Sequence, residues 1–259
     1  MTFIDTHTHL YSEEFDEDRN EMVARAIEAG AEYLLLPNID ANSVGPMLAM
    51  CDEWPEVCRP MMGLHPTELP ENPTLLLDQM ERMLSVLGNP FIAVGEVGVD
   101  FYWDASRRDE QMEVFRRQVE WSIRFDKPLV VHSRSAHEEL LEVLTPFKSE
   151  LKGGIFHCFG GSAKEAEDLL NFDNFFLGIG GVVTFKKSTL PAVLETTVPL
   201  DRIVIETDAP YLSPHPYRSK RNEPARLPLV LHRLAEIYGT TAENVAEVTT
   251  HNAKQLFRL

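Results

Sequence analysis

The stretch Phe3-Ile4-Asp5-Thr6-His7-Thr8-His9-Leu10 places a short apolar strand directly before a His-x-His pair. Side chains of a strand alternate between its two faces, so His7 and His9 point to the same side while Thr8 points away. Two imidazoles that converge from one strand end are suited to bind a metal ion. A bare His-x-His pair is equally compatible with two polar histidines at a strand exit, so the rest of the chain has to decide between these interpretations.

Short β-rich runs alternate with helical patterns along the whole chain. One helical stripe, from Met22 to Ile27, stops at Gly30, and Thr240 with Glu243 reads as the capping box of a last helix. Several strand candidates are continuously apolar, which favours parallel pairing under covering helices. We predict eight strands, at residues 2–5, 32–36, 59–63, 91–95, 128–132, 154–157, 175–179 and 202–206.

Eight such β-then-α units in 259 residues predict one α/β domain over residues 1–259, a (β/α)₈ TIM barrel. An open, doubly wound sheet is the alternative. The three cysteines show no C-x-x-C spacing, so the sequence indicates neither a disulfide framework nor a thiolate zinc site.

The charge balance limits the partners of the protein. Asp and Glu number 41 against 24 Lys and Arg, which gives a formal charge of −17 and argues against broad electrostatic binding to nucleic acid or to an anionic membrane. Any phosphate substrate therefore needs a local positive site, which bound cations supply. The sequence shows no signal peptide and no transmembrane run, so we expect a cytoplasmic protein without membrane contact, and no obligate protein partner is evident.

Polar side chains follow most of the predicted strands at the end where a barrel carries its chemistry. Each has a structural explanation when taken alone, such as a hydrogen-bonded rim histidine or a helix N-cap, but their coincidence favours one site. Four imidazoles and two carboxylates exceed one tetrahedral site, which predicts two divalent ions with Glu96 as the bridge. The predicted metal ligands are His7, His9, Glu96, His132, His157 and Asp208.

These residues lie in six ordered motifs that resemble the TatD family of metal-dependent deoxyribonucleases, which belong to the amidohydrolase-like barrels. The motifs are Asp5-Thr6-His7-Thr8-His9-Leu10, Gly63-Leu64-His65-Pro66, Gly95-Glu96-Val97-Gly98-Val99-Asp100, Lys127-Pro128-Leu129-Val130-Val131-His132-Ser133-Arg134, His157-Cys158-Phe159-Gly160-Gly161 and Glu206-Thr207-Asp208-Ala209-Pro210-Tyr211-Leu212. The resemblance implies that His7, His9, Glu96 and Asp208 hold one ion and that Glu96, His132 and His157 hold the other. It also implies that His65 contacts substrate phosphate, and it covers a basic segment, residues 218–224, in which Ser219 replaces a usual glycine.

We therefore predict a hydrolase in which two divalent ions (Zn²⁺, Mg²⁺, Mn²⁺ or Ni²⁺) activate a water, with Asp208 and Glu96 as the catalytic carboxylates and Asp208 as the general base. The resemblance adds the substrate, single-stranded DNA or strand ends cleaved as by an exonuclease. Predicted substrate-binding residues are His65, Arg134, Arg218, Lys220 and Arg221.

Several alternatives stay open. Arg134 is equally suited to a surface salt bridge. Phe101, Tyr102 and Trp103 can stack an unpaired base or pack their loop. The same ions also suit an amidohydrolase acting on a lactone, amide or ester. Outside catalysis, the chain can be a binding protein with structural ions.

Overall fold

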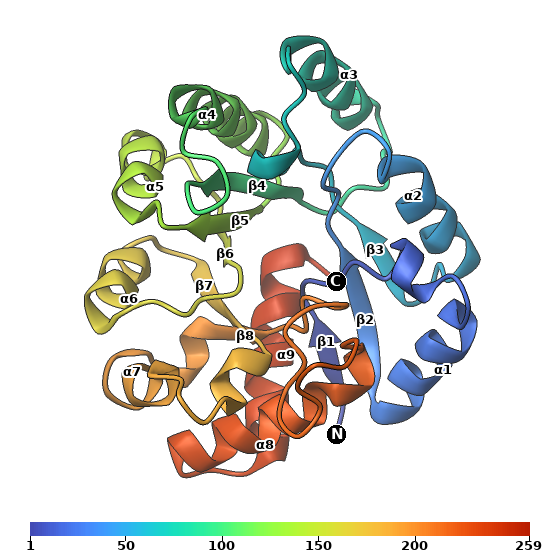
Figure 1. The fold of residues 1–259 in the computed structure, drawn as a ribbon, viewed down its shortest axis with the longest axis vertical. Coiled ribbons are helices and arrows are strands. Elements are labelled where there is room, and N and C mark those ends of the chain that lie inside the picture. The colour runs from blue at the N-terminus through green and yellow to red at the C-terminus, as the bar shows by residue number, and fades with distance from the viewer.

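Eight parallel strands and nine α-helices alternate along the chain in the computed structural model, which describes residues 1–259 (Figure 1). Regular pairing forms a three-stranded sheet in the order β1-β2-β3 and a five-stranded sheet in the order β4-β5-β6-β7-β8. The strands are β1 Phe3–Asp5, β2 Ala31–Leu36, β3 Cys58–Pro60, β4 Val94–Asp100, β5 Leu129–Arg134, β6 Gly154–Phe156, β7 Phe175–Ile179 and β8 Ile203–Ile205.

Isolated parallel bridges join the two sheets at both seams. Met62 pairs with Val94 between β3 and β4, and Thr8 pairs with Ala209 between β8 and β1. At the second seam the Thr6 N–H donates a 3.1 Å hydrogen bond to the Ile205 carbonyl oxygen. The strands therefore follow one another around a ring, although the regular ladders stop at both seams. This confirms the (β/α)₈ prediction and excludes the open doubly wound sheet, in which β1 and β8 would not be neighbours.

Helices surround this ring of strands (Figure 1). The prediction that the first helix stops at Gly30 is confirmed, because Gly30 caps it with a φ of 110°. No helix combines the length and apolar character needed to cross a bilayer. The helices are α1 Arg19–Ala29, α2 Val44–Glu53, α3 Thr74–Ser85, α4 Arg108–Arg124, α5 His137–Leu144, α6 Ala163–Leu170, α7 Leu190–Thr197, α8 Leu227–Tyr238 and α9 Ala242–Phe257.

The start of the last helix is one residue later than predicted. Thr241 is the N-cap of α9, and its side chain accepts a hydrogen bond from the Asn244 N–H. In the predicted capping box the Glu243 carboxylate would accept a hydrogen bond from the Thr240 N–H, but this N–H donates to the Ala235 carbonyl oxygen at the end of α8. The prediction of a Thr240–Glu243 capping box is therefore wrong.

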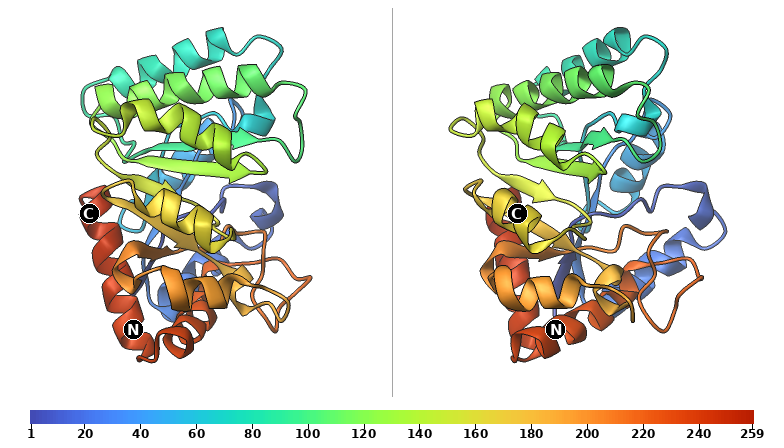
Figure 2. Two further views of the ribbon diagram at one scale, coloured as in Figure 1. Left: turned by 90° about the vertical axis from the view of Figure 1, so that its left-hand side faces the viewer. Right: turned by 60° about the vertical axis from the view of Figure 1, so that its left-hand side comes forward.

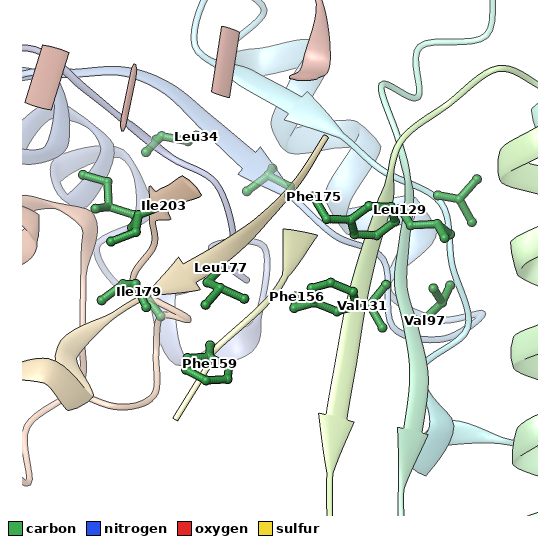
Figure 3. Close-up of a cluster of buried hydrophobic side chains, with 14 of the residues drawn as sticks. Leu34, Val97, Leu129, Val131, Phe156, Phe159, Phe175, Leu177, Ile179 and Ile203 are labelled. Carbon is green, nitrogen blue, oxygen red and sulfur yellow. The ribbon is translucent and has the colours of Figure 1, made fainter. Parts of the chain in front are cut away.

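Two separate apolar clusters lie on the two sides of the strand ring. The larger contains alternate strand residues such as Leu129, Val131, Leu177 and Ile179 (Figure 3). Helix side chains complete this cluster. The smaller takes one residue from each of the eight strand segments and adds three residues of α9, which therefore covers the floor of the barrel. Its members are Ile4, Leu35, Met61, Ala93, Val130, Ile155, Phe176, Val204, Ala253, Leu256 and Phe257.

The fourth and fifth strands extend further toward the rim than predicted. β4 ends at Asp100 rather than residue 95, and β5 ends at Arg134 rather than residue 132. Their added residues pair with each other, with Gly98 opposite His132 and Asp100 opposite Arg134. Gly98 has a φ of 142°, and a Cβ there would overlap the His132 carbonyl oxygen, so only glycine permits this close pairing. The longer β4 includes Glu96, which therefore lies on a strand beside the strand that carries His132.

Candidate active site

The side chains predicted at the strand ends gather in one pocket of about 490 Å³ at the carboxyl end of the barrel. This is the end opposite α9 (Figure 2). His7 lies directly behind the pocket and is completely buried. The predicted residues that line it are His9, His65, Glu96, His132, Arg134, His157 and Asp208.

Glu96 stands at the centre, and its two carboxylate oxygens face different sets of imidazoles. Oε2 lies 3.2 Å from His7 Nε2 and 3.6 Å from His9 Nε2. Oε1 lies 3.1 Å from His132 Nδ1 and 3.2 Å from His157 Nε2. A carboxylate in this position can bind a different cation with each oxygen, as the sequence predicts.

Asp208 completes the first of these sets. Its Oδ1 atom lies 3.5 Å from His9 Nε2 and 3.8 Å from His7 Nε2. The backbone of Asp208 is held against β1, because its N–H donates a 2.9 Å hydrogen bond to the His7 carbonyl oxygen. His7, His9, Glu96 and Asp208 thus converge on one volume, although they come from three distant parts of the chain.

The donor set fits divalent cations. The Nε2 atoms of His7 and His9 are only 3.2 Å apart, so two ring nitrogens converge where carboxylate oxygens also point. Burial alone would raise the pKa of Glu96, but the imidazoles of His7, His65 and His157 hold it well below its ordinary value. The carboxylate is therefore ionised, which is the form that binds metal.

Comparison with known proteins shows the family of the chain. The model of TatD-related DNases matches residues 4–258. The chain belongs to this family. It is 36% identical to the uncharacterized metal-dependent hydrolase YabD of Bacillus subtilis over 98% of both chains. It is 31% identical to the 3'-5' ssDNA/RNA exonuclease TatD of Pectobacterium atrosepticum, over 98% of this chain and 99% of that protein.

A solved TatD structure shares the fold. The chain superposes on YJJV, a TatD homolog from Escherichia coli K12, with a TM-score of 0.92 and 28% identity, over 99% of this chain and 98% of that one. The resemblance to the TatD family is thereby confirmed, and the protein is a metal-dependent hydrolase acting on ester bonds. This excludes the alternative of a binding protein with structural ions.

Three further residues of this TatD-family site orient the predicted ligands. Asp100 Oδ2 lies 2.9 Å from His132 Nε2, and Glu206 Oε1 lies 3.1 Å from His157 Nδ1. The Tyr11 hydroxyl lies 2.9 Å from His9 Nδ1. Each contact occupies the ring nitrogen that points away from the pocket, so the other nitrogen is directed to the site.

None of these orienting residues has a role among the sequence-based predictions. Asp100 and Glu206 both stand within the motifs at the ends of strands, and a buried carboxylate near a predicted histidine ligand is the signal that could have found them. Burial alone would lower the pKa of His157, but the carboxylates of Glu206 and Glu96 hold it well above its ordinary value. Tyr11 follows His9 by two residues and offers no comparable signal.

His65 lies beside the second set of ligands. Its Nε2 atom is 3.4 Å from Glu96 Oε1, and its Nδ1 atom is 2.8 Å from the Thr67 hydroxyl. Burial lowers the pKa of His65, so the ring is neutral at pH 7. The structure thus brings His65 to the pocket, where a neutral imidazole can bind either an ion or a substrate oxygen.

Arg134 lies at the mouth of the pocket with two aromatic side chains. Its guanidinium is 3.8 Å from the centre of the Tyr102 ring and 5.5 Å from that of Trp103. Arg134 forms no ion pair, so the alternative of a surface salt bridge is wrong. Phe101 is half-buried and packs against the apolar core, as the packing alternative predicts, whereas Tyr102 and Trp103 are 59% and 68% exposed.

The basic segment after β8 does not line this pocket. Arg218 is exposed, with its guanidinium 3.5 Å from the centre of the Phe185 ring. Lys220 is exposed. Arg221 instead binds the Asp18 carboxylate with contacts of 2.7 and 2.8 Å, which leaves little of its charge for a substrate. Ser219 adopts a φ of 67°, the conformation that the usual glycine favours.

Proposed function

We propose that this TatD-family hydrolase is a nuclease that removes nucleotides from the ends of single-stranded DNA, using two divalent ions. The observation that carries the proposal is the placement of the two Glu96 oxygens, which face two separate groups of imidazole nitrogens. One ion would be held by His7, His9, Glu96 and Asp208, and the other by Glu96, His132 and His157. The nitrogen and oxygen donors suit Zn²⁺, Mn²⁺ and Ni²⁺, and Mg²⁺ if more waters are retained.

When bound, such a pair of ions polarises a phosphodiester and makes hydroxide available near neutral pH. Asp208 is the proposed general base. Burial alone would raise its pKa, but His9, His157 and His7 keep the pKa of this carboxyl below its ordinary value. Asp208 is therefore ionised and able to orient a water and accept its proton.

Two features support a phosphate-bearing, single-stranded substrate. Arg134 has no carboxylate partner and can donate paired hydrogen bonds to phosphate oxygens at the mouth of the pocket. The exposed rings of Tyr102 and Trp103 beside it offer flat faces on which an unpaired base can stack, worth about 1–3 kcal/mol per base. The relatives named as ssDNA/RNA exonucleases agree with this substrate.

We further propose that residues 1–259 form one domain, because a single ring of strands carries the whole site. The cytoplasmic location stays a prediction of the sequence.

The substrate contacts of Lys220 and Arg221 also stay predictions of the sequence. The Arg221→Ala variant tests whether Arg221 contacts the substrate. A raised KM for DNA would support a direct contact, whereas an unchanged KM would mean that Arg221 only forms its ion pair with Asp18.

The test is degradation of end-labelled single-stranded DNA by metal-stripped protein to which Mg²⁺, Mn²⁺ or Zn²⁺ is returned. We expect metal-dependent shortening from one end, absent in His132→Ala and in Asp208→Asn. A parallel assay with RNA and with a panel of lactones, amides and carboxylic esters compares substrate classes. Hydrolysis of a carbonyl compound far faster than of DNA would replace the nuclease by the amidohydrolase alternative.

A further inference from the structure

A second, positively charged concavity lies on the same rim of the barrel as the metal pocket. We call it the basic groove. It has a volume of about 450 Å³, and no carboxylate is among the residues that line it. The lining residues used below are Phe185, Lys186, Lys187, His215 and Arg218.

The groove is built by the loops that follow β7 and β8, which lie side by side at the end of the barrel away from α9 (Figure 2). The His215 N–H donates a 2.8 Å hydrogen bond to the Thr184 hydroxyl, which ties one loop to the other. The loop after β8 also lines the metal pocket, through Tyr211 and Leu212. A substrate strand that leaves the metal pocket over this loop therefore reaches the groove, because Leu212 of the pocket and His215 of the groove are only a few residues apart in the chain.

The cations of the groove are free. Lys186, Lys187 and Arg218 form no ion pair, whereas Arg221, three residues after Arg218, is bound to Asp18. The chain has 41 acidic residues and a net charge of −17, so three cations that share one concavity with no carboxylate in its lining form a locally positive site. Arg218 is also held in place, because its guanidinium lies 3.5 Å from the centre of the Phe185 ring.

We infer that the basic groove binds the phosphodiester backbone of the substrate strand, beyond the nucleotide that is cleaved. The inference rests on the proposed nuclease function and extends it to a second subsite. Lysines supply charge without base selectivity, and the stacked Arg218 offers its N–H edges to phosphate oxygens. The groove thereby favours longer strands over dinucleotides.

The test compares two double variants. Lys186→Gln/Lys187→Gln removes two charges from the groove. Lys148→Gln/Lys152→Gln is the matched control, because these lysines are also exposed and free of ion pairs but precede β6, at the opposite end of the barrel. For each protein, kcat/KM is measured on bis(p-nitrophenyl) phosphate, on a dinucleotide and on an oligothymidylate of about ten nucleotides.

We expect the groove variant to lose about fivefold or more in kcat/KM on the long strand, with the two small substrates unchanged. The control variant keeps all three values. The dependence of long-strand affinity on salt should also become shallower, by about 0.7 in log–log slope for each phosphate contact removed. Equal losses on long and short substrates, or equal behaviour of the two variants, would overturn the inference.

A binding measurement separates this inference from the proposed function. Fluorescence anisotropy with the metal-free proteins and a labelled oligothymidylate reports on strand binding without cleavage. We expect the Kd of the groove variant to rise about fivefold or more above those of the wild type and of the control. An unchanged Kd, or no binding by the wild type, refutes the groove even if the nuclease is active. Normal binding with no cleavage under any ion refutes the nuclease alone.

Discussion

Replacing Asp100 by asparagine tests how the second set of ligands is oriented. Asp100 Oδ2 lies 2.9 Å from His132 Nε2, while Oδ1 accepts hydrogen bonds of 3.0 Å from the N–H groups of Tyr102 and Trp103. Asparagine has nearly the same shape but only one acceptor oxygen, so it cannot serve both sides. We expect Asp100→Asn to weaken metal binding at His132.

Both orientations of the new amide are unfavourable. If its oxygen faces Tyr102 and Trp103, its NH₂ group faces His132 Nε2, and the ring proton moves to Nδ1, the nitrogen that otherwise binds the ion. If its oxygen faces His132, two backbone N–H groups lose their acceptor, at about 1–3 kcal/mol for each group left unpaired. A cost of about 2 kcal/mol corresponds to a roughly 30-fold lower affinity for the ion. This lies within the range of about 10–100-fold for the loss of such orienting residues.

The assay is calorimetric titration of the metal-stripped protein with Zn²⁺ or Mn²⁺, with a thermal melt to confirm folding. Asp104→Asn is the matched control, because Asp104 lies in the loop that follows Asp100 and its carboxylate accepts hydrogen bonds from Ser106 rather than from a histidine. We expect Asp100→Asn to bind one ion with lower affinity and the other with unchanged affinity. Asp104→Asn should bind both ions with unchanged affinity. Equal affinities in all three proteins would refute the claim that Asp100 sets the ring orientation of His132.

Three other predictions concern catalysis and stability. Asp208→Asn lowers kcat on end-labelled single-stranded DNA by about 10²–10⁴-fold while the metal-free protein melts normally, and an active variant would remove the proposed general base. Gln118→Leu leaves the buried N–H and C=O of Leu64, now bonded at 2.7 and 3.1 Å, without partners. A loss of about 2–4 kcal/mol should lower Tm by several degrees in a scanning calorimeter, and an unchanged Tm contradicts it. Hydrogen bonds from Arg221 and Arg25 lower the pKa of Asp18 from 3.8 to about 2. This stabilisation is present above about pH 4 and is lost as pH falls toward 2, so denaturant unfolding of Arg221→Ala should show a smaller loss of stability over that range.

The sequence alone determined the architecture and which histidines and carboxylates gather at the carboxyl end of the barrel. Apolar strands and amphipathic helices alternate with periods that are visible in one dimension, and a parallel barrel brings all carboxyl ends of its strands to one rim. His7, Glu96, His132 and Asp208 could therefore be grouped although they are far apart in the chain. The capping of α9 and the ends of β4 and β5 were less predictable, because they depend on neighbouring elements rather than on local pattern.

Only the tertiary structure decided how these side chains are directed. Glu96 divides its two oxygens between two groups of histidines, and Asp100 and Glu206 orient two of those rings, because strands distant in sequence are neighbours in the barrel. Similarly, Arg221 and Arg218 look equivalent in the sequence, yet one pairs with Asp18 and the other lies over Phe185. The partner of an exposed charge depends on which loops meet at the rim, and no periodicity of the chain encodes that meeting.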